Sequence, residues 1–260
     1  MDKNIEFEEE VKNNIYRLGG NKRLSDMSLN WMIEASRVGR YSYNFSWCGR
    51  PIIQYPQDIV AVQEIIWKVR PDIIVETGIA HGGSLILSAS MLALLDYCDA
   101  VQTCGIFDQL ASKRRVIGVD IDIRDHNRRA ISEHPLSHKI DMFEGSSIDP
   151  KIVSSIGDKV KKCDSVLVIL DSNHTHEHVL QELMAYAPLV TVNSYCIVFD
   201  TIIADTPEDL IGDRPWGKRN NPKGAVHEFL KLNDKFIIDE KIHDKLQITV
   251  APDGFLRRVR

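Results

Sequence analysis

The sequence predicts an α/β fold built on a mostly parallel sheet of seven strands. From residue 73 onward, short runs rich in Val, Ile and Leu alternate with segments of helical pattern, as in consecutive β-α-β units. The run 166–170 contains no polar residue, which is typical of a strand covered by helices on both faces. The runs 236–238 and 246–250 lie close together in the chain, which favours an antiparallel last strand.

The first part of the chain has a different character. Residues 1–45 are polar, with scattered apolar positions, and predict helices. Residues 47–59 hold two prolines and a glycine and predict an extended entry segment. Asp58 is expected to cap a helix that runs to about Val69, just before Pro71.

Strands and helices then alternate along the rest of the chain. The expected strands are 73–75, 116–119, 140–143, 166–170, 195–199, 236–238 and 246–250. The expected helices are 83–95, 127–133, 150–160, 175–186 and 225–232. Residues 202–223 hold three prolines and two glycines and predict a long loop. We expect an N-terminal segment over residues 1–58 and one main domain over residues 59–260.

Composition limits the function classes. The 260 residues are 43% hydrophobic and 27% charged, as in ordinary globular proteins. The net charge of −5 gives no positive field for nucleic acid, and no window of 18 consecutive apolar residues predicts a membrane span. The polar start of the chain lacks the apolar core of a signal peptide, and the five cysteines form no C-x-x-C pair. We therefore expect a cytoplasmic protein with reduced thiols.

Ligands of open α/β sheets bind beyond the carboxyl ends of the strands, and the first such end is rich in glycine. Glu76 ends the strand, and Gly78 and Gly82 precede a helix N-terminus, where a backbone can approach a ligand closely. A carboxylate there would repel a pyrophosphate and attract a cation, which favours S-adenosylmethionine over a dinucleotide. The alternative is a tight strand–helix turn without a ligand.

The second strand ends at Asp120, which is expected to bind ribose hydroxyls, with Asp122 as the second choice. A solvated loop acid is the alternative. After the third strand, residues 145–149 could pass an adenine edge, or Ser147 or Asp149 could cap the next helix.

The fourth strand leads into the densest chemical cluster of the chain. Asp171 is an oxygen ligand suited to Mg²⁺, and His174 is a candidate general base. Asp200, after the fifth strand, would meet Asp171 if the two strands are neighbours. A zinc site is the alternative, because His174 and His178 would share a helix face.

Together these strand ends resemble a class I S-adenosylmethionine-dependent methyltransferase with a Rossmann-like fold. More specifically, residues 47–258 resemble the family named after cephalosporin hydroxylase, which includes rhamnosyl O-methyltransferases. The motifs that carry the resemblance are W-x-G-x-P-x-x-Q-x-P-x-D at 47–58, the loop 76–84, GVDID at 118–122, D-S-N-H at 171–174, V-x-D-T at 198–201 and the closing PDGFLRR. The resemblance implies a homo-oligomer and a small-molecule or glycan acceptor.

Catechol-type methyltransferases are similar at E-x-G-x-x-x-G-x-S and G-x-S-x-D. That similarity implies that Ser84 contacts the methionine carboxylate and Ser147 the adenine. Macrolide sugar methyltransferases are similar at D-x-x-H, which implies that Asp171 binds magnesium and His174 is the base.

One position departs from these relatives, which carry two adjacent polar ligands after the fifth strand. Here the pair is Phe199 and Asp200, so Asp171 and Asp200 are the expected metal ligands. Thr201 or waters would complete the shell, and Mg²⁺ would bind more weakly than in the relatives.

The expected function is therefore Mg²⁺-assisted methyl transfer from S-adenosylmethionine to a hydroxyl of a sugar or natural product, as in surface-glycan or secondary-metabolite synthesis. Residues 202–223, with Arg214 and Trp216, are expected to form a lid over the acceptor. Three alternatives remain: oxygenation of a natural product by ferrous iron held by Asp171, His174 and His176, a zinc hydrolase, and a non-catalytic nucleotide-binding subunit.

Overall fold

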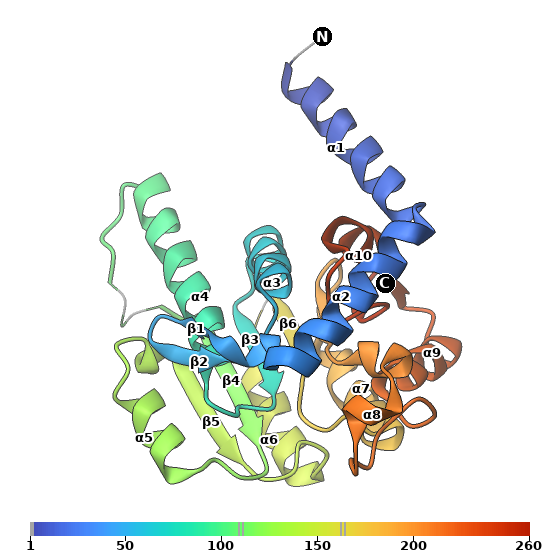
Figure 1. The fold of residues 1–260 in the computed structure, drawn as a ribbon. Helices are drawn as coiled ribbons and strands as arrows, with labels where there is room; N and C mark the ends of the chain where they lie inside the picture. Colours follow the sequence, from blue (N-terminus) through green and yellow to red (C-terminus); the bar gives the residue numbers. More distant parts are fainter. Residues whose placement is uncertain (1–2, 109, 111, 162, 164) are drawn as a thin grey trace.

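The computed structural model describes residues 3–108, 110, 112–161, 163 and 165–260, and its centre is one sheet (Figure 1). Seven strands follow the order β5-β4-β3-β6-β7-β9-β8. They are β3 (Ile73–Thr77), β4 (Arg115–Asp120), β5 (Ile140–Glu144), β6 (Val166–Leu170), β7 (Tyr195–Val198), β8 (Phe236–Ile238) and β9 (Phe255–Arg258). The pairs from β5 to β7 are parallel, and β9 runs antiparallel to both β7 and β8. The predicted α/β fold with a mostly parallel sheet is confirmed.

Helices cover both faces of this sheet, and each face has its own apolar core. One core receives residues of α3 (Pro56–Val69), α4 (Gly83–Gln102), α5 (Asp125–Ser132) and α10 (Glu240–Leu246). The other receives residues of α6 (Pro150–Val160), α7 (His176–Tyr186) and α9 (Pro222–Leu232). Successive strand residues point to opposite faces, so Ile74 belongs to the first core and Val75 to the second. This two-sided cover explains why all five residues of β6 are apolar.

Among the described helices, one is long and apolar enough to cross a membrane by length and composition. It is α4, with a mean hydropathy of 1.5 over its most apolar window. Its buried residues pack into the first core beside β4. Packing against the sheet accounts for the buried face of α4, while Leu94, Tyr97 and Val101 on the same helix are exposed.

Two helices and a hairpin precede the sheet, and no residue of the first helix is buried. They are α1 (Lys3–Gly19), α2 (Lys22–Gly39), the short 3₁₀ helix η1 (Tyr41–Asn44), β1 (Phe45–Trp47) and β2 (Arg50–Ile52). Figure 1 shows α1 extending away from the sheet, while α2 runs back across the molecule. The predicted entry segment is thus a β hairpin followed directly by α3.

Asp58 does not cap α3, contrary to the prediction. The helix begins at Pro56, whose fixed φ suits the first helical position, and Tyr55 is its N-cap. The buried Asp58 carboxylate instead accepts hydrogen bonds from the Thr249 hydroxyl and, at 3.0 Å, from the Val250 N–H.

The last predicted strand, 246–250, is wrong. Residues Glu240–Leu246 form α10, because Ile242 and Leu246 lie four residues apart and pack together into the first core. The Val250 N–H is bonded to Asp58 rather than to a strand. The antiparallel strand is Phe255–Arg258, within the closing PDGFLRR.

The stretch predicted as a long loop also contains short helices. These are η4 (Thr201–Asp205) and α8 (Glu208–Ile211), each about one turn long. Asp209 of α8 pairs with Arg37 of α2 at 2.8 Å, so this stretch is joined to the N-terminal segment.

The strand order places a reversal at the centre of the sheet. From β3 the chain moves outward to β4 and β5, then returns to place β6 on the other side of β3. Open α/β sheets bind ligands at the carboxyl ends of the strands beside such a reversal. The loops after β3 and β6 are therefore where a site is expected.

Candidate active site

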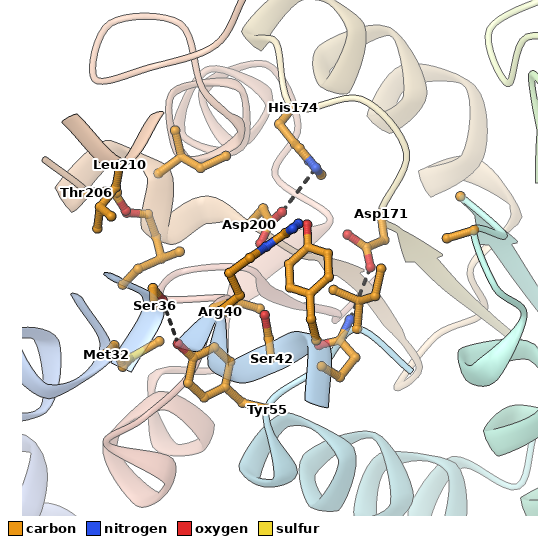
Figure 2. A pocket seen from close by; sticks show the side chains of 18 of the residues that line it. Met32, Ser36, Arg40, Ser42, Tyr55, Asp171, His174, Asp200, Thr206 and Leu210 are labelled. Carbon is orange, nitrogen blue, oxygen red and sulfur yellow. Dashed lines mark hydrogen bonds and ion pairs between the residues drawn. The ribbon is translucent and has the colours of Figure 1, made fainter. Parts of the chain in front are cut away.

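A cavity of about 850 Å³ opens at this edge of the sheet (Figure 2). Its walls come from the loops after β3, β6 and β7, from α2 and the hairpin, and from residues 202–216. Five of the predicted site residues line it: Gly78, Ser84, Asp171, His174 and Asp200. Four others do not: Glu76, Gly82, Asp120 and Ser147.

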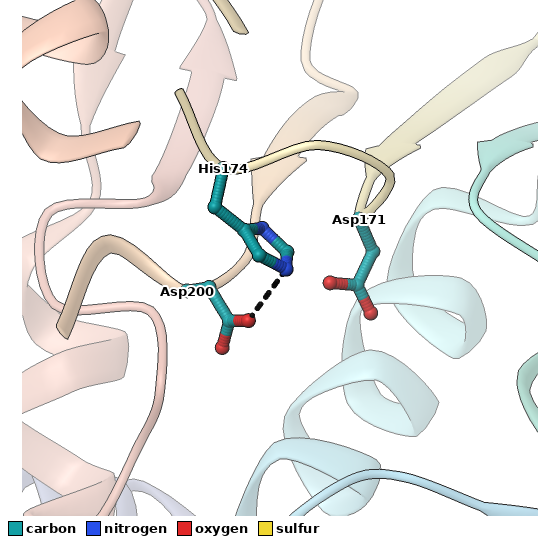
Figure 3. A group of neighbouring side chains, drawn as sticks. All are labelled: Asp171, His174 and Asp200. Atoms are coloured by element: carbon teal, nitrogen blue, oxygen red, sulfur yellow. Dashed lines mark ion pairs between the residues drawn. The ribbon is translucent and has the colours of Figure 1, made fainter. Parts of the chain in front are cut away.

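Asp171, His174 and Asp200 lie together in the cavity (Figure 3). Strands β6 and β7 are parallel neighbours, so the residues that follow them emerge side by side. One potential ligand atom from each of the three side chains lies within 4.8 Å of the others. His174 Nε2 is 3.1 Å from Asp200 Oδ2. Within the described residues, no other group of three or more His, Cys, Asp or Glu side chains has this geometry.

Gln54 supports this cluster from the segment before α3. Its side-chain amide donates a hydrogen bond to Asp171 Oδ2 at 3.1 Å, and Gln54 is only 6% exposed. Gln54 is part of the motif at 47–58, but the sequence predicted no role for it in the site. The contact spans 117 positions in the chain, so no local pattern indicated it.

The environment of Asp171 is strongly acidic. Burial raises the pKa of Asp171 well above its usual range, and repulsion from Asp200 and Glu76 raises it further. A cation bound between Asp171 and Asp200 would relieve this repulsion, and carboxylate oxygens are the ligands that Mg²⁺ prefers. The residues present therefore fit a divalent metal.

Glu76 is buried behind the cavity, and it lines a smaller space shared with Gln54, Asp58 and Asp171. Burial raises the pKa of Glu76 to about 7, although the hydroxyls of Ser84 and Ser88 partly offset the rise. The two hydroxyls lie near the carboxylate, but neither they nor any other described group meets hydrogen-bond geometry with a Glu76 oxygen. Such an unpaired buried carboxylate fits a cationic ligand group.

The loop after β3 is held in place by Asp120, which does not line the cavity, and by close contact with the loop after β6. Asp120 Oδ2 accepts hydrogen bonds from the Ile79 N–H at 2.8 Å and from the Ala80 N–H at 3.2 Å. Gly78 has φ +90°, and a Cβ placed there would lie 2.0 Å from the Asp171 carbonyl oxygen. The glycine is thus required for the close approach of the loops after β3 and β6.

Asp120 therefore anchors this loop. Its ribose-binding role stays a prediction, as does the role of Gly82. Asp122 is exposed.

Ser147 is also placed outside the cavity. Its hydroxyl lies 3.0 Å from His178 Nε2, and its carbonyl accepts the Tyr186 hydroxyl at 2.6 Å. The neighbouring Asp149 caps α6 by accepting from the Lys151 N–H, as the capping alternative predicts. The predicted contact of Ser147 with adenine is not tested by these bonds.

The geometry does not support the zinc or ferrous alternatives. His174 precedes α7, which begins at His176, so His174 and His178 do not share a helix face. His176 Nε2 lies 3.2 Å from Glu228, and His178 contacts Ser147. Neither ring joins the group formed by Asp171, His174 and Asp200.

Residue 199, where the relatives carry a polar ligand, belongs to the apolar core in this protein. Phe199 is 4% exposed and packs into the first apolar core. Thr201 is fully buried and does not line the cavity, and its hydroxyl donates to the Pro252 carbonyl at 2.6 Å, so it is not placed to complete a metal shell there. His174 is instead the third polar side chain near the two aspartates.

Residues of the N-terminal segment and of the stretch 202–216 also line the cavity around the cluster. Trp216 stands edge-on to His174, with ring centroids 4.9 Å apart. Figure 2 shows Arg40, just after α2, pointing into the cavity toward Asp200. The N-terminal segment thus forms a cavity wall, although the sequence predicted no site residue within it.

Comparison with known proteins gives consistent results. The sequence model of the family described as rhamnosyl O-methyltransferase/CmcI matches residues 39–259. A rhamnosyl O-methyltransferase of Mycobacterium tuberculosis is 30% identical over 207 residues, which cover 77% of this chain and 73% of that protein. One from Mycobacterium leprae is 25% identical over 222 residues, which cover 85% and 86%.

Solved structures show the same fold. A CmcI structure with Mg and S-adenosylmethionine aligns with a TM-score of 0.51 and 17% identity over 84% of this chain and 78% of that one. An apo CmcI structure aligns with a TM-score of 0.50 and 21% identity over 88% and 83%. These likenesses confirm the predicted Rossmann-like methyltransferase fold.

Proposed function

The chain belongs to the rhamnosyl O-methyltransferase/CmcI family, and from this premise we propose that it transfers a methyl group from S-adenosylmethionine to a hydroxyl of a sugar or natural product, assisted by Mg²⁺. Its family makes the protein an S-adenosylmethionine-dependent O-methyltransferase. One observation supports the metal-assisted transfer to a hydroxyl: Asp171, His174 and Asp200 meet beside the glycine loop after β3.

The glycine loop and the acids beside it suit the nucleoside. Gly78 and Ser84 line the cavity, and the unpaired carboxylate of Glu76 lies directly behind them. The ammonium and sulfonium groups of S-adenosylmethionine are cations, so these side chains fit the methionine end. The adenosine end would extend toward Asp120 and Ser147.

Asp171 and Asp200 would hold the metal. Bound there, Mg²⁺ would lower the pKa of the acceptor hydroxyl. His174 would accept the proton of that hydroxyl: its Nε2 now lies 3.1 Å from Asp200 Oδ2, and it can act as the base once Asp200 binds the metal instead.

Gln54 fixes the orientation of Asp171 by its hydrogen bond. Trp216, packed against His174, and the segment 202–216 shield the reacting atoms from water, as a lid would.

Calorimetry with S-adenosylmethionine, S-adenosylhomocysteine and NAD tests the cofactor directly. We expect both methionine nucleosides to bind and NAD to bind far more weakly. Tight binding of NAD together with no binding of either nucleoside would overturn the proposal.

Methyl transfer is then measured on a panel of rhamnosides and other deoxysugar glycosides, with and without Mg²⁺. We expect Asp171→Asn to lose both the activity and its response to Mg²⁺. Asp253→Asn is the matched control, since Asp253 lies outside the cavity and pairs with His227.

A further inference from the structure

Two arginines in the cavity lack a charged partner. Arg40 and Arg214 both line it, and among the described residues neither guanidinium forms a hydrogen bond or ion pair. Arg37, also in the cavity, is different: it pairs with Glu34 at 2.6 Å and with Asp209 at 2.8 Å. The donors of Arg40 and Arg214 are therefore open to a ligand.

Each of the two exposed guanidinium groups lies near an aromatic ring. The Arg40 Cζ lies 4.0 Å from the centroid of the Tyr43 ring, and the Arg214 Cζ lies 5.9 Å from that of Trp216. At 4.0 Å the Arg40 group stacks on its ring, which orients the planar group and leaves its N–H edge free, whereas at 5.9 Å the Arg214 group is within reach of a cation–π attraction only. Such an edge matches the two oxygens of a carboxylate or phosphate.

Arg40 occupies a constrained backbone position. It has φ +45°, and its N–H donates to the Ser36 carbonyl at 3.0 Å, which ends α2 there. Figure 2 shows the side chain directed into the cavity. Arg214 comes from the other wall, and its partner Trp216 contacts His174. Both arginines are thus placed around the space next to the candidate base.

The charge balance of the loaded cavity favours an anion. In the function proposed above, the divalent metal balances Asp171 and Asp200, and Arg37 already balances Asp209. S-adenosylmethionine carries a net positive charge, and Glu76 balances it in the arrangement proposed above. Arg40 and Arg214 then remain as uncompensated positive charges.

From this we infer that the acceptor carries an anionic group, a carboxylate or a phosphate, which Arg40 and Arg214 bind while its hydroxyl reaches His174. This inference rests on the proposed methyltransferase function and narrows its substrate class. The arginines set the specificity for the acceptor and do not contact the transferred methyl group.

Calorimetry with matched sugars tests the inference on Mg²⁺-loaded protein saturated with S-adenosylhomocysteine. One pair is methyl α-D-glucuronoside against methyl α-D-glucoside, and the other is α-L-rhamnose 1-phosphate against methyl α-L-rhamnoside. We expect at least one anionic sugar to bind about tenfold or more tightly than its neutral counterpart. The two pairs distinguish a carboxylate from a phosphate.

Variants identify the residues responsible. Arg40→Ala and Arg214→Ala should each weaken binding of the preferred anionic sugar by about tenfold to a hundredfold and leave the neutral sugar unaffected. Arg40→Lys keeps the positive charge but lacks the planar guanidinium group, so it should weaken binding of the anionic sugar less than Arg40→Ala does. Arg23→Ala, an exposed arginine of α2 outside the cavity, is the control and should change nothing.

Three results would overturn the inference. The first is equal binding, or equal absence of binding, within both sugar pairs. The second is a preference for the anion that survives both alanine variants. The third is loss of S-adenosylhomocysteine binding by Arg40→Ala without any sugar, which would assign Arg40 to the cofactor carboxylate. Failure of the wild-type protein to bind the nucleoside at all would count instead against the proposed function.

Discussion

Gly78 stands where the loops after β3 and β6 touch. Its φ is +90°, and a Cβ added to it would lie only 2.0 Å from the Asp171 carbonyl oxygen, so there is no room for a side chain. We expect Gly78→Ala to lower the free energy of unfolding by about 2–4 kcal/mol and to weaken nucleoside binding.

Urea denaturation checks the effect of Gly78→Ala against Gly157→Ala. A Cβ on Gly157, inside α6, would meet nothing within 4 Å. That control should be stabilised by about 0.5–1 kcal/mol, as for alanine in a helix. Equal stability of the two variants would contradict the role assigned to Gly78.

His174 is the residue on which proton transfer depends. His174→Ala should lower kcat by about a hundredfold or more, because positioned proton transfer contributes on that scale. Nucleoside affinity and melting temperature should not change, because the ring faces the acceptor.

The matched variant for His174 is His227→Ala, which removes another histidine paired with an aspartate at 3.0 Å but outside the cavity. It should leave kcat unchanged. A stable His174→Ala variant with normal turnover would show that the proton leaves by another route.

Some residues of the candidate site could be predicted from the sequence and others could not. Asp171, His174 and Asp200 closely follow apolar strands, so strand order alone brings them to one edge of the sheet. Gln54 and Arg40 reach the same cavity from the N-terminal segment, through contacts that depend on how α2 and the hairpin pack. No spacing in the sequence encodes that packing.

At the scale of elements, Asp58 joins α3 to the segment between α10 and β9 through Thr249 and Val250. Burial raises the pKa of Asp58 to about 7, above the usual value of 3.8. Between about pH 4 and pH 7 the folded protein therefore holds a proton that the unfolded chain has released. This proton on Asp58 stabilises the folded protein relative to the unfolded chain. Its contribution to the free energy of unfolding is complete below about pH 4 and is lost as the pH rises through about 7.

Asp58→Asn tests this linkage, because an amide cannot ionise. Between about pH 5 and pH 8 the free energy of unfolding of the wild type should fall by about 2 kcal/mol more than that of the variant. Urea titrations at both pH values measure the difference. Asp149→Asn, at the exposed start of α6, is the control, and parallel pH profiles for wild type and Asp58→Asn would refute the linkage.

The elements were predictable to the extent that their patterns are local. The wholly apolar β6 and the proline-started α6 have the predicted bounds. The strand predicted after β8 was wrong because the alternation of apolar and polar residues at 246–250 suits a strand, whereas contacts with Asp58 and the first core decide the conformation of this segment. Tertiary contacts overrode local preference there.

At the scale of the whole molecule, the repulsion between Asp171 and Asp200 predicts that a divalent cation stabilises the folded protein. Mg²⁺ that binds only the folded protein should raise its melting temperature by a few degrees at concentrations well above the dissociation constant. Because the pKa of Asp171 is raised, protons compete with the metal, and the increase should be larger at about pH 8 than at about pH 6.

Thermal denaturation with and without Mg²⁺ measures this effect. Asp171→Asn should abolish the increase, while Asp253→Asn should retain it. A melting temperature that does not respond to Mg²⁺ in the wild-type protein at either pH would contradict the proposed metal site.

The strand order β7-β9-β8 has a consequence for the timing of assembly during synthesis. Strand β8 is made before β9, yet β9 is the strand that lies between β8 and the rest of the sheet. While a nascent chain is still held at β8 in the ribosomal tunnel, that strand has no sheet edge of its own to join. The parallel strands β3 to β7 precede β8 in the chain, whereas the antiparallel edge is complete only when β9 is present to pair with both β7 and β8. Thr249 and Val250, which bond to Asp58, also lie between β8 and β9, and Val250 lines the cavity, so this part of the cavity wall too depends on residues made after β8.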